Sequence, residues 1–193
     1  AALALIWKSK RKNDRIDAAK LAKLLYLDAV PAAHVPSAAV RQWRRLIELR
    51  RSLVRQRARI KNQVHALLRT CGIASPPSLF ANRGIDWLLR QALDEASSLE
   101  RAVLIEQMRG LKAQLKTVEK ALRRSSDDDP RLALLMTVPG VGRRTAEAFL
   151  AYVDRISRFS RSGKVGSYFG LVPCEDSSAG RERLGHITKQ GPP

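Results

Sequence analysis

Residues 37–70 read SAAVRQWRRLIELRRSLVRQRARIKNQVHALLRT, and this stretch decides the fold. Its apolar residues recur in alternating steps of four and three, which is a heptad spacing with arginines at two of the positions. That spacing predicts one long helix, from about Ser37 to Thr70, with an apolar seam that packs against another helix. Gly72 and the prolines at 76–77 should end it. The seam consists of Ala39, Trp43, Leu46, Arg50, Leu53, Arg57, Ile60, Val64 and Leu67.

A second heptad seam follows after a short amphipathic segment at about residues 85–93. It again predicts a long helix. Two such helices with a connector between them indicate either an antiparallel helical hairpin or pairing between subunits. The second seam consists of Leu104, Met108, Leu111, Leu115, Val118 and Leu122.

The remaining chain predicts shorter elements on either side of this pair. An apolar, strand-like run at residues 1–7 precedes a helix of about residues 14–27, for which Asn13 is the N-cap. A polar linker at 125–130 precedes two short helices, the second at about 143–153. We therefore expect a mainly α protein with parts at 1–36, 37–124 and 125–193. Because the chain opens inside the apolar run, we expect it to belong to a longer protein.

The composition points to a polyanionic partner. The chain of 193 residues carries 36 Lys and Arg against 18 Asp and Glu, a formal net charge of +18. Each phosphate contact would release condensed counterions, although a solvated basic surface is the alternative. Aromatic residues are only 5%, which disfavours extended platforms for base stacking. The sequence has no apolar run that could span a membrane, and the two distant cysteines, Cys71 and Cys174, favour a cytoplasmic protein.

The first long helix is itself strongly basic. Between Arg41 and Arg69 it carries ten Lys and Arg, opposed only by Glu48. These cations predict contacts to a phosphate backbone of DNA or RNA, although they could instead flank a coiled coil with their stems along its surface. The residues that we assign to phosphate contacts here are Arg44, Arg51, Arg55, Arg59 and Lys61.

The segment VPGVG at residues 138–142 lies between the two short helices of the last part. Two glycines, Gly140 and Gly142, permit a tight turn, and the next helix would present free backbone amides to a phosphate. Arg143 and Arg144 follow directly and add charge. This pattern is typical of a helix-hairpin-helix motif that binds the DNA backbone, or of an ordinary glycine turn.

Asp14 and Asp17 form a carboxylate pair near the start of the first predicted helix. Their i, i+3 spacing places both on one helix face, where they could share a cation. Hard oxygen ligands suit Mg²⁺, which supports phosphodiester chemistry. The alternative is an exposed, salt-bridged helix start that is favoured by the helix dipole.

Three blocks of the chain resemble one family. KNDRIDAAKLA at 12–22 resembles the third carboxylate block of DEDD-type insertion-sequence transposases, which are RNA-guided recombinases also called bridge-RNA recombinases. LVRQRARIKNQVHAL at 53–67 is similar to the helical region of that family. The stretch from VPGVG through FGLVP at 169–173 and SSAG at 177–180 to RLGHITKQG at 183–191 is similar to its last domain. The blocks match in order and spacing over nearly the whole chain.

The resemblance implies a RuvC-like, RNase-H-fold domain of which 1–36 is the remnant, then a coiled-coil domain and a small helical transposase domain. In the family four acidic residues bind Mg²⁺. The last two map onto Asp14 and Asp17, and the first two would precede residue 1. The family's nucleophilic serine maps onto Ser177 and Ser178, with Ser178 favoured, although Ala179 stands where the family has glycine. Further phosphate contacts are expected from Arg181, Arg183 and Lys189.

The resemblance therefore implies a DNA transposase that uses Mg²⁺ carboxylates and a serine nucleophile. Its expected partners are DNA, a structured guide RNA and further copies of itself, as a dimer or tetramer with a site shared between subunits. We expect no strand cleavage by this chain alone, because half of the metal ligands would lie outside it. Two other hypotheses remain open, a non-enzymatic helix-hairpin-helix DNA-binding module and a basic coiled-coil scaffold for RNA.

Overall fold

A computed structural model of the chain describes residues 13–30, 33–175 and 183–192. The chain divides into two compact units, Ala1–Pro36 and Ser37–Pro193. The first contains α2 (Asp14–Tyr26). The second contains α3 (Ala38–Thr70), α4 (Asn82–Leu89), α5 (Glu95–Ser126), α6 (Pro130–Met136), α7 (Arg143–Val153), η1 (Ile156–Arg158), α8 (Ser162–Tyr168), β1 (Pro173–Glu175) and β2 (Leu184–Ile187). The described part is mainly α, as predicted, and the strand-like run at 1–7 lies outside it.

Helix α2 begins where its sequence predicts. The Asn13 side chain accepts a hydrogen bond from the Arg15 amide at 2.9 Å and so caps the first turn. The helix ends at Tyr26, after which Asp28 adopts a left-handed backbone with φ of 48°. Leu24 is its buried residue.

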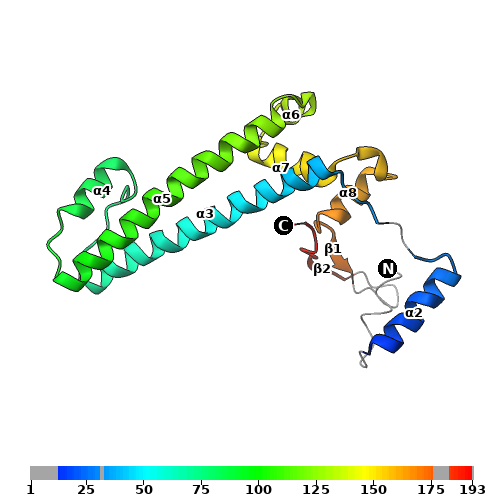
Figure 1. Cartoon of the computed structure of the whole chain (residues 1–193), viewed down its shortest axis with the longest axis horizontal. Helices are drawn as coiled ribbons and strands as arrows, with labels where there is room; N and C mark the ends of the chain where they lie inside the picture. Colours follow the sequence, from blue (N-terminus) through cyan, green and yellow to red (C-terminus); the bar gives the residue numbers. More distant parts are fainter. Residues whose placement is uncertain (1–12, 31–32, 176–182, 193) are drawn as a thin grey trace. The chain divides into compact units, whose positions relative to one another are not determined.

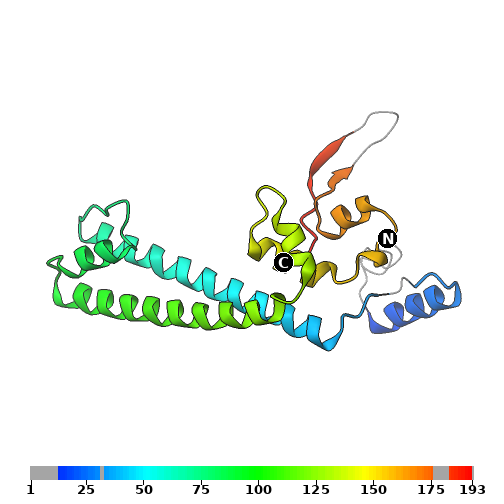
Figure 2. The same cartoon turned by 90° about the horizontal axis from the view of Figure 1, so that it is seen from above.

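Helices α3 and α5 lie side by side and antiparallel, with α4 at the far end from α6 and α7 (Figures 1 and 2). The two heptad seams therefore pair within one chain. Ser37 caps α3 by accepting from the Val40 amide at 3.3 Å, and Asp94 caps α5 by accepting from the Ser97 amide at 2.9 Å. Gly72 ends α3 with φ of 68°, a conformation that favours glycine.

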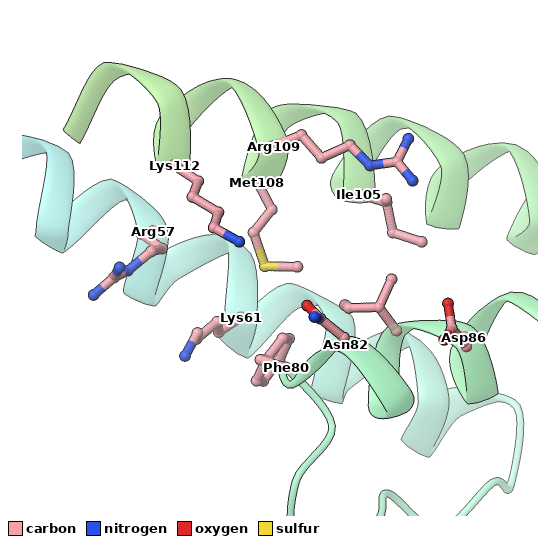
Figure 3. Close-up of a pocket in the computed structure, with 10 residues that line it drawn as sticks. Arg57, Lys61, Phe80, Asn82, Asp86, Ile105, Met108, Arg109 and Lys112 are labelled. Atoms are coloured by element: carbon pink, nitrogen blue, oxygen red, sulfur yellow. The ribbon is translucent and has the colours of Figure 1, made fainter. Parts of the chain in front are cut away.

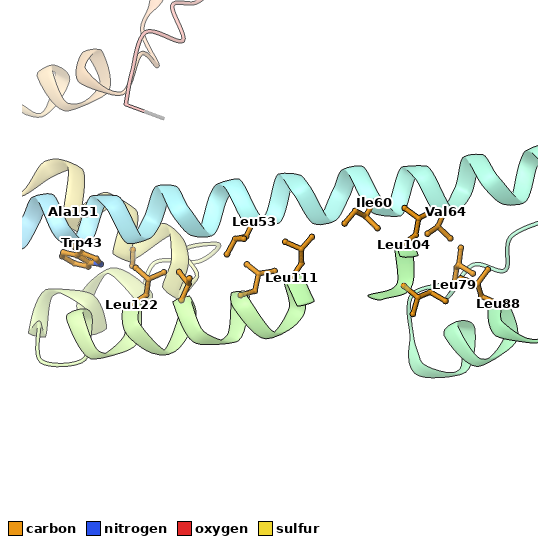
Figure 4. Close-up of a cluster of buried hydrophobic side chains, with 14 of the residues drawn as sticks. Trp43, Leu53, Ile60, Val64, Leu79, Leu88, Leu104, Leu111, Leu122 and Ala151 are labelled. Carbon is orange, nitrogen blue, oxygen red and sulfur yellow. The ribbon is translucent and has the colours of Figure 1, made fainter. Parts of the chain in front are cut away.

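One apolar core runs along this hairpin (Figure 4). Leu53 faces Leu111, and Ile60 lies near Leu104, as the seams predict. At the seam position of Arg50, the guanidinium Nε lies 2.9 Å from Glu119 Oε1 on α5, which compensates its charge there. No helix in the described ranges is long and apolar enough to cross a membrane.

The core continues into α6 and α7. Leu132, Ala146 and Leu150 belong to the same buried cluster as the hairpin. Helix α5 also runs through Ser125 and Ser126, which the sequence placed in a linker. Ser126 is fully buried, and its hydroxyl donates to Glu147 of α7 at 2.9 Å. This hydrogen bond allows a polar residue to lie in the buried last turn of α5. The predicted boundary at 124/125 therefore lies inside a helix, and 37–193 form one compact unit.

After α8 the chain forms a two-stranded antiparallel sheet, with Pro173 opposite Ile187 and Glu175 opposite Leu184. We predicted a small helical last part, and this prediction did not contain the sheet. Both strands are exposed over their whole length and too short to show a period of two. Two backbone bonds fix the hairpin base, Thr188 N–H to Val172 O and Lys189 N–H to Gly170 O, both at 3.0 Å.

Candidate functional site

The predicted carboxylates both lie in the first turn of α2. Asp14 is exposed, whereas Asp17 is half-buried. The Asp17 Oδ1 atom is buried and has no hydrogen-bond partner within the described residues. A buried carboxylate oxygen without a donor is costly unless something else compensates it. Among the described residues, the Asp17 Oδ1 atom is therefore an uncompensated buried acceptor.

The chemistry of this carboxylate pair suits Mg²⁺. Mg²⁺ is commonly held by one or two carboxylates together with waters and substrate phosphates. Within the described ranges, no three His, Cys, Asp or Glu side chains gather as a metal site. Further protein ligands are therefore not supplied by the described residues, and the metal assignment of Asp14 and Asp17 stays a prediction.

The serine segment lies between the two strands. Ser177, Ser178 and Arg181 lie outside the described residues, in the stretch that connects β1 to β2. Arg183 is exposed directly before β2. Lys189 is exposed two residues after the end of β2, with a left-handed φ of 53°. Both strands that flank the serine segment therefore lie exposed on the surface.

Two glycines bring the two ends of this segment together. A Cβ atom on Gly170 would lie 2.5 Å from the Gln190 nitrogen, and one on Gly191 would lie 2.3 Å from the Phe169 carbonyl oxygen. Both contacts are with backbone, so no side-chain rotation could relieve them. Gly170 also has φ of 66°. Gly170 of FGLVP and Gly191 of RLGHITKQG are thus explained by close backbone approach.

The glycine turn between α6 and α7 is open to solvent. Gly140 has φ of 83°, and a Cβ atom on Gly140 or Gly142 would meet nothing within 4 Å. Gly142 is the N-cap of α7, and no side-chain cap binds the first-turn amides of this helix. This geometry leaves room for an approaching backbone.

The two arginines after the turn are neutralised within the protein. Arg143 Nε lies 3.0 Å from Glu147 Oε1, and Arg143 also donates to Asp127, which raises the pKa of its guanidinium. Arg144 Nη1 lies 2.7 Å from Glu147 Oε2, and Glu147 is only 1% exposed. The i+3 and i+4 spacing of Glu147 is the sequence signal for these pairs. Their free charge is lower than the sequence suggested.

Arg44 also has a role in packing. Its guanidinium donates to the carbonyl of Ala151 at 2.8 Å and to that of Tyr152 at 3.1 Å, which satisfies the last turn of α7. The Tyr152 hydroxyl in turn donates to Glu48 at 2.6 Å, and burial together with this carboxylate raises the pKa of Tyr152. Glu48 therefore links α3 to α7 through this hydrogen bond.

The other predicted cations of α3 differ in their exposure. Arg51 is half-buried, whereas Arg55 and Arg59 are exposed. The Lys61 ammonium lies 4.6 Å from the centre of the Phe80 ring. In the part of the chain that the structure describes, Arg55, Arg59 and Lys61 form no ion pair. Of the predicted cations, Arg55, Arg59 and Lys61 therefore carry charge that no carboxylate of the described residues compensates.

Sequence reasoning missed part of the charged surface here. Arg57 looked like a seam residue, and Arg109 and Lys112 of α5 were assigned no role. All three line a cleft of about 410 Å³ beside Lys61 (Figure 3). Their spacing of three to four residues within each helix was the available signal, but only the pairing of α3 with α5 brings the two sets together.

Comparison with known proteins finds transposase family models that match the first and the last part of the chain. Residues 132–193 match the model described as the transposase IS116/IS110/IS902 family, and residues 3–73 match an IS110-type DEDD transposase model. The chain is 30% identical over 190 residues to a transposase for insertion sequence element IS1328 of Yersinia enterocolitica, covering 93% of this chain and 54% of that protein. It is 28% identical over 191 residues to a probable family 20 transposase of Pseudomonas aeruginosa, covering 93% and 55%.

A third relative is a transposase for insertion sequence element IS1111A of Coxiella burnetii. The identity is 26% over 184 residues, covering 93% of this chain and 50% of that protein. The chain thus spans about half the length of the curated relatives it matches.

Proposed function

The chain carries transposase domains of the IS110/IS116 family toward both ends, and on that basis we propose that it is part of a recombinase that cuts and joins the DNA of a mobile insertion sequence. The observation that carries the proposal is the order of the two matches. The first contains the carboxylates Asp14 and Asp17, and the second contains the serines Ser177 and Ser178. Metal-binding carboxylates and a nucleophile are the two parts that strand transfer needs.

In the proposed reaction the Ser178 hydroxyl is the nucleophile, with Ser177 as its neighbour. The serine oxygen would form a bond to the phosphorus as a phosphorus–oxygen bond to one sugar breaks. The serine proton leaves to solvent or a base, and the departing sugar oxygen takes up a proton. The DNA strand would then be held on the protein, ready to be joined to another sugar hydroxyl.

Asp14 and Asp17 would hold Mg²⁺, with Asp17 contributing the buried Oδ1 atom that lacks a donor within the described residues. When bound, Mg²⁺ would stabilise negative charge on the phosphate and promote ionisation of a nearby hydroxyl. In the family that the sequence resembles, the carboxylates and the serine come from different subunits. We therefore also propose a homo-oligomer, a dimer or tetramer, as the active form.

DNA and a structured guide RNA are the proposed nucleic-acid partners. The net charge of +18 supports a polyanionic partner, and Arg55, Arg59 and Lys61, which have no ion pair among the described residues, would supply contacts. The open turn at Gly140 and Gly142 supports a helix-hairpin-helix contact through backbone amides. Arg143 and Arg144, in contrast, contribute less, because both are bound to Glu147.

The salt dependence of DNA binding tests the proposal. The purified chain would be titrated into a fluorescein-labelled duplex, with binding read by fluorescence anisotropy at several salt concentrations. We expect affinity to fall by about 10³ or more between about 50 and 200 mM salt, as for proteins with many phosphate contacts. Binding that hardly changed over this range would contradict the proposed contacts.

A metal titration tests the carboxylates separately. Mn²⁺, as a spectroscopic substitute for Mg²⁺, would be followed by electron paramagnetic resonance in the parent chain and in Asp17→Asn. We expect the variant to bind Mn²⁺ more weakly. Unchanged binding would remove Asp17 from the proposed site.

A further inference from the structure

A cleft opens between α3, α5 and the start of α4, at the end of the hairpin away from the glycine turn (Figure 3). Its volume of about 410 Å³ is in the range of sites that take small organic ligands. Neither the family resemblance nor the proposed chemistry assigns it a role. Its lining has two parts, a charged rim and an apolar base.

The rim is positively charged. Arg57 and Lys61 of α3 and Arg109 and Lys112 of α5 line it, against one carboxylate, Asp86. Arg57, Lys61 and Lys112 have no ion pair among the described residues. Arg109 lies 3.7 Å from Glu106, but both side chains are largely exposed, which makes that pair weak. The cleft thus has more cations than its own carboxylate can compensate, unlike the arginines beside the glycine turn.

The base is apolar and partly aromatic. Ile105 is 3% exposed, and Met108 and Phe80 are half-buried beside it. The Lys61 ammonium lies over the Phe80 ring, 4.6 Å from its centre, in a cation–π contact. Inorganic phosphate alone would use the rim and leave this apolar surface exposed to water. The ligand that uses both parts is an anion with a flat apolar body.

We propose that the cleft binds one unpaired nucleotide of a single-stranded nucleic-acid segment. Its phosphate would lie at Arg57, Lys61 and Lys112, and its base would lie on Phe80 and Met108, with the Lys61 ammonium moving from the face of the Phe80 ring to the phosphate. Asn82 and Asp86 lie at the polar edge of the cleft, where they can form hydrogen bonds with the edge of a base. Base pairs in a duplex are stacked and cannot enter such a cleft, whereas an unstacked base can.

This inference rests on the proposed function, since it assumes a nucleic-acid partner, and it adds a preference for single strands at a stated place. The scarcity of aromatic residues argues against an extended stacking platform. It does not argue against a site for a single base, which requires only one aromatic ring.

The test compares two double variants of the whole chain. Arg57→Gln with Lys61→Gln removes two charges from the cleft. Arg55→Gln with Arg59→Gln removes two charges from the same helix outside the cleft and is the matched control. The probes are a fluorescein-labelled 12-nucleotide RNA of unstructured sequence, the DNA strand of the same sequence, and its duplex, each followed by anisotropy.

We expect the cleft variant to lose about fivefold or more affinity for the single strands beyond the loss in the control, since a charge-assisted hydrogen bond to the phosphate contributes at least that much. Both variants should lose equally for the duplex. A Phe80→Leu variant, which keeps an apolar side chain in the core, should lose single-strand affinity without changing the salt dependence. Circular dichroism at 222 nm would verify that each variant is folded.

Equal losses for the two double variants on the single-stranded probes would overturn the cleft site while leaving duplex binding, and so the proposed function, intact. Absence of binding to every probe by the parent chain would overturn the proposed function itself. A selective loss on RNA, on DNA or on both supports the cleft site and identifies which strand fills it.

Discussion

Replacing Gly170 by alanine should release the β1–β2 hairpin without unfolding the helical part. Gly170 combines a left-handed backbone, φ 66°, with a close approach to the Gln190 and Gly191 nitrogens, at 2.5 and 2.7 Å from a Cβ atom. Gly72 is a matched control. It has nearly the same φ, 68°, but a Cβ atom there would meet nothing within 4 Å.

The size of the effect follows from these contacts. Alanine in the left-handed region costs about 1 kcal/mol at either position. At Gly170 the added carbon also overlaps backbone, so residues 189–191 must move away. That movement would break the bonds from Lys189 N–H to Gly170 O and from Thr188 N–H to Val172 O, each contributing about 1 kcal/mol. We therefore expect about 3 kcal/mol of local destabilisation at Gly170 and about 1 kcal/mol of global destabilisation at Gly72.

Hydrogen exchange followed by mass spectrometry distinguishes the two effects. In Gly170→Ala, peptides from 183–192 should exchange about 100-fold faster, because each 1.4 kcal/mol is a factor of ten in the opening equilibrium. Thermal unfolding followed by circular dichroism should change little, since both strands are exposed and lie outside the buried core. Gly72→Ala should lower the unfolding temperature and leave the hairpin peptides unchanged. Unchanged exchange at 183–192 in Gly170→Ala would refute the argument that glycine holds the base of the serine segment.

Four further substitutions test the buried and charged contacts. Glu147→Gln should destabilise the chain by about 3 kcal/mol in urea unfolding, because it leaves two arginines without their buried carboxylate. The same variant should bind duplex DNA more tightly if the turn contacts phosphate, and weaker binding would contradict that contact. Arg44→Ala should destabilise the chain by about 2 kcal/mol by removing two hydrogen bonds to α7, and it should leave the salt slope of DNA binding unchanged. Arg59→Ala should instead reduce that slope by about 1 and preserve stability, and the opposite pattern would mean that we have exchanged the roles of these arginines. The Arg131 guanidinium beside Asp129 lowers the pKa of that carboxyl. The stabilising effect of the ionised Asp129 carboxyl is therefore fully present above about pH 3.9 and is lost as the pH falls through the lowered pKa. Thermal unfolding between pH 5 and pH 2 should therefore be less sensitive to acid in Asp129→Asn, and an equal acid sensitivity would exclude this carboxyl as a cause.

The sequence predicted the helices well because their signals are local. The seam through Leu53, Ile60 and Val64 predicted the buried face of α3, and Asn13 predicted the start of α2. The sheet was missed because exposed strands of three and four residues leave no periodic pattern.

Charge compensation was much less visible from the sequence. The carbonyl partners of Arg44 lie 107 and 108 residues away, and the carboxylate partner of Arg50 lies 69 residues away. No spacing rule reaches so far, so counting charges along α3 overestimated what its first half offers to a phosphate.

The arginines beside the glycine turn are paired with a carboxylate, whereas Arg55 and Arg59 of α3 have no ion pair among the described residues. The two surfaces should therefore bind a phosphate backbone in different ways. At Gly140 and Gly142 the accessible groups are backbone amides, because the adjacent arginines are bound to Glu147. Amide contacts release few counterions, so this turn should contribute affinity that depends little on salt. Along the second half of α3, exposed cations such as Arg55 and Arg59 should account for the steep salt dependence. Binding measured at high salt would therefore report on the glycine turn, and the additional binding at low salt would report on α3.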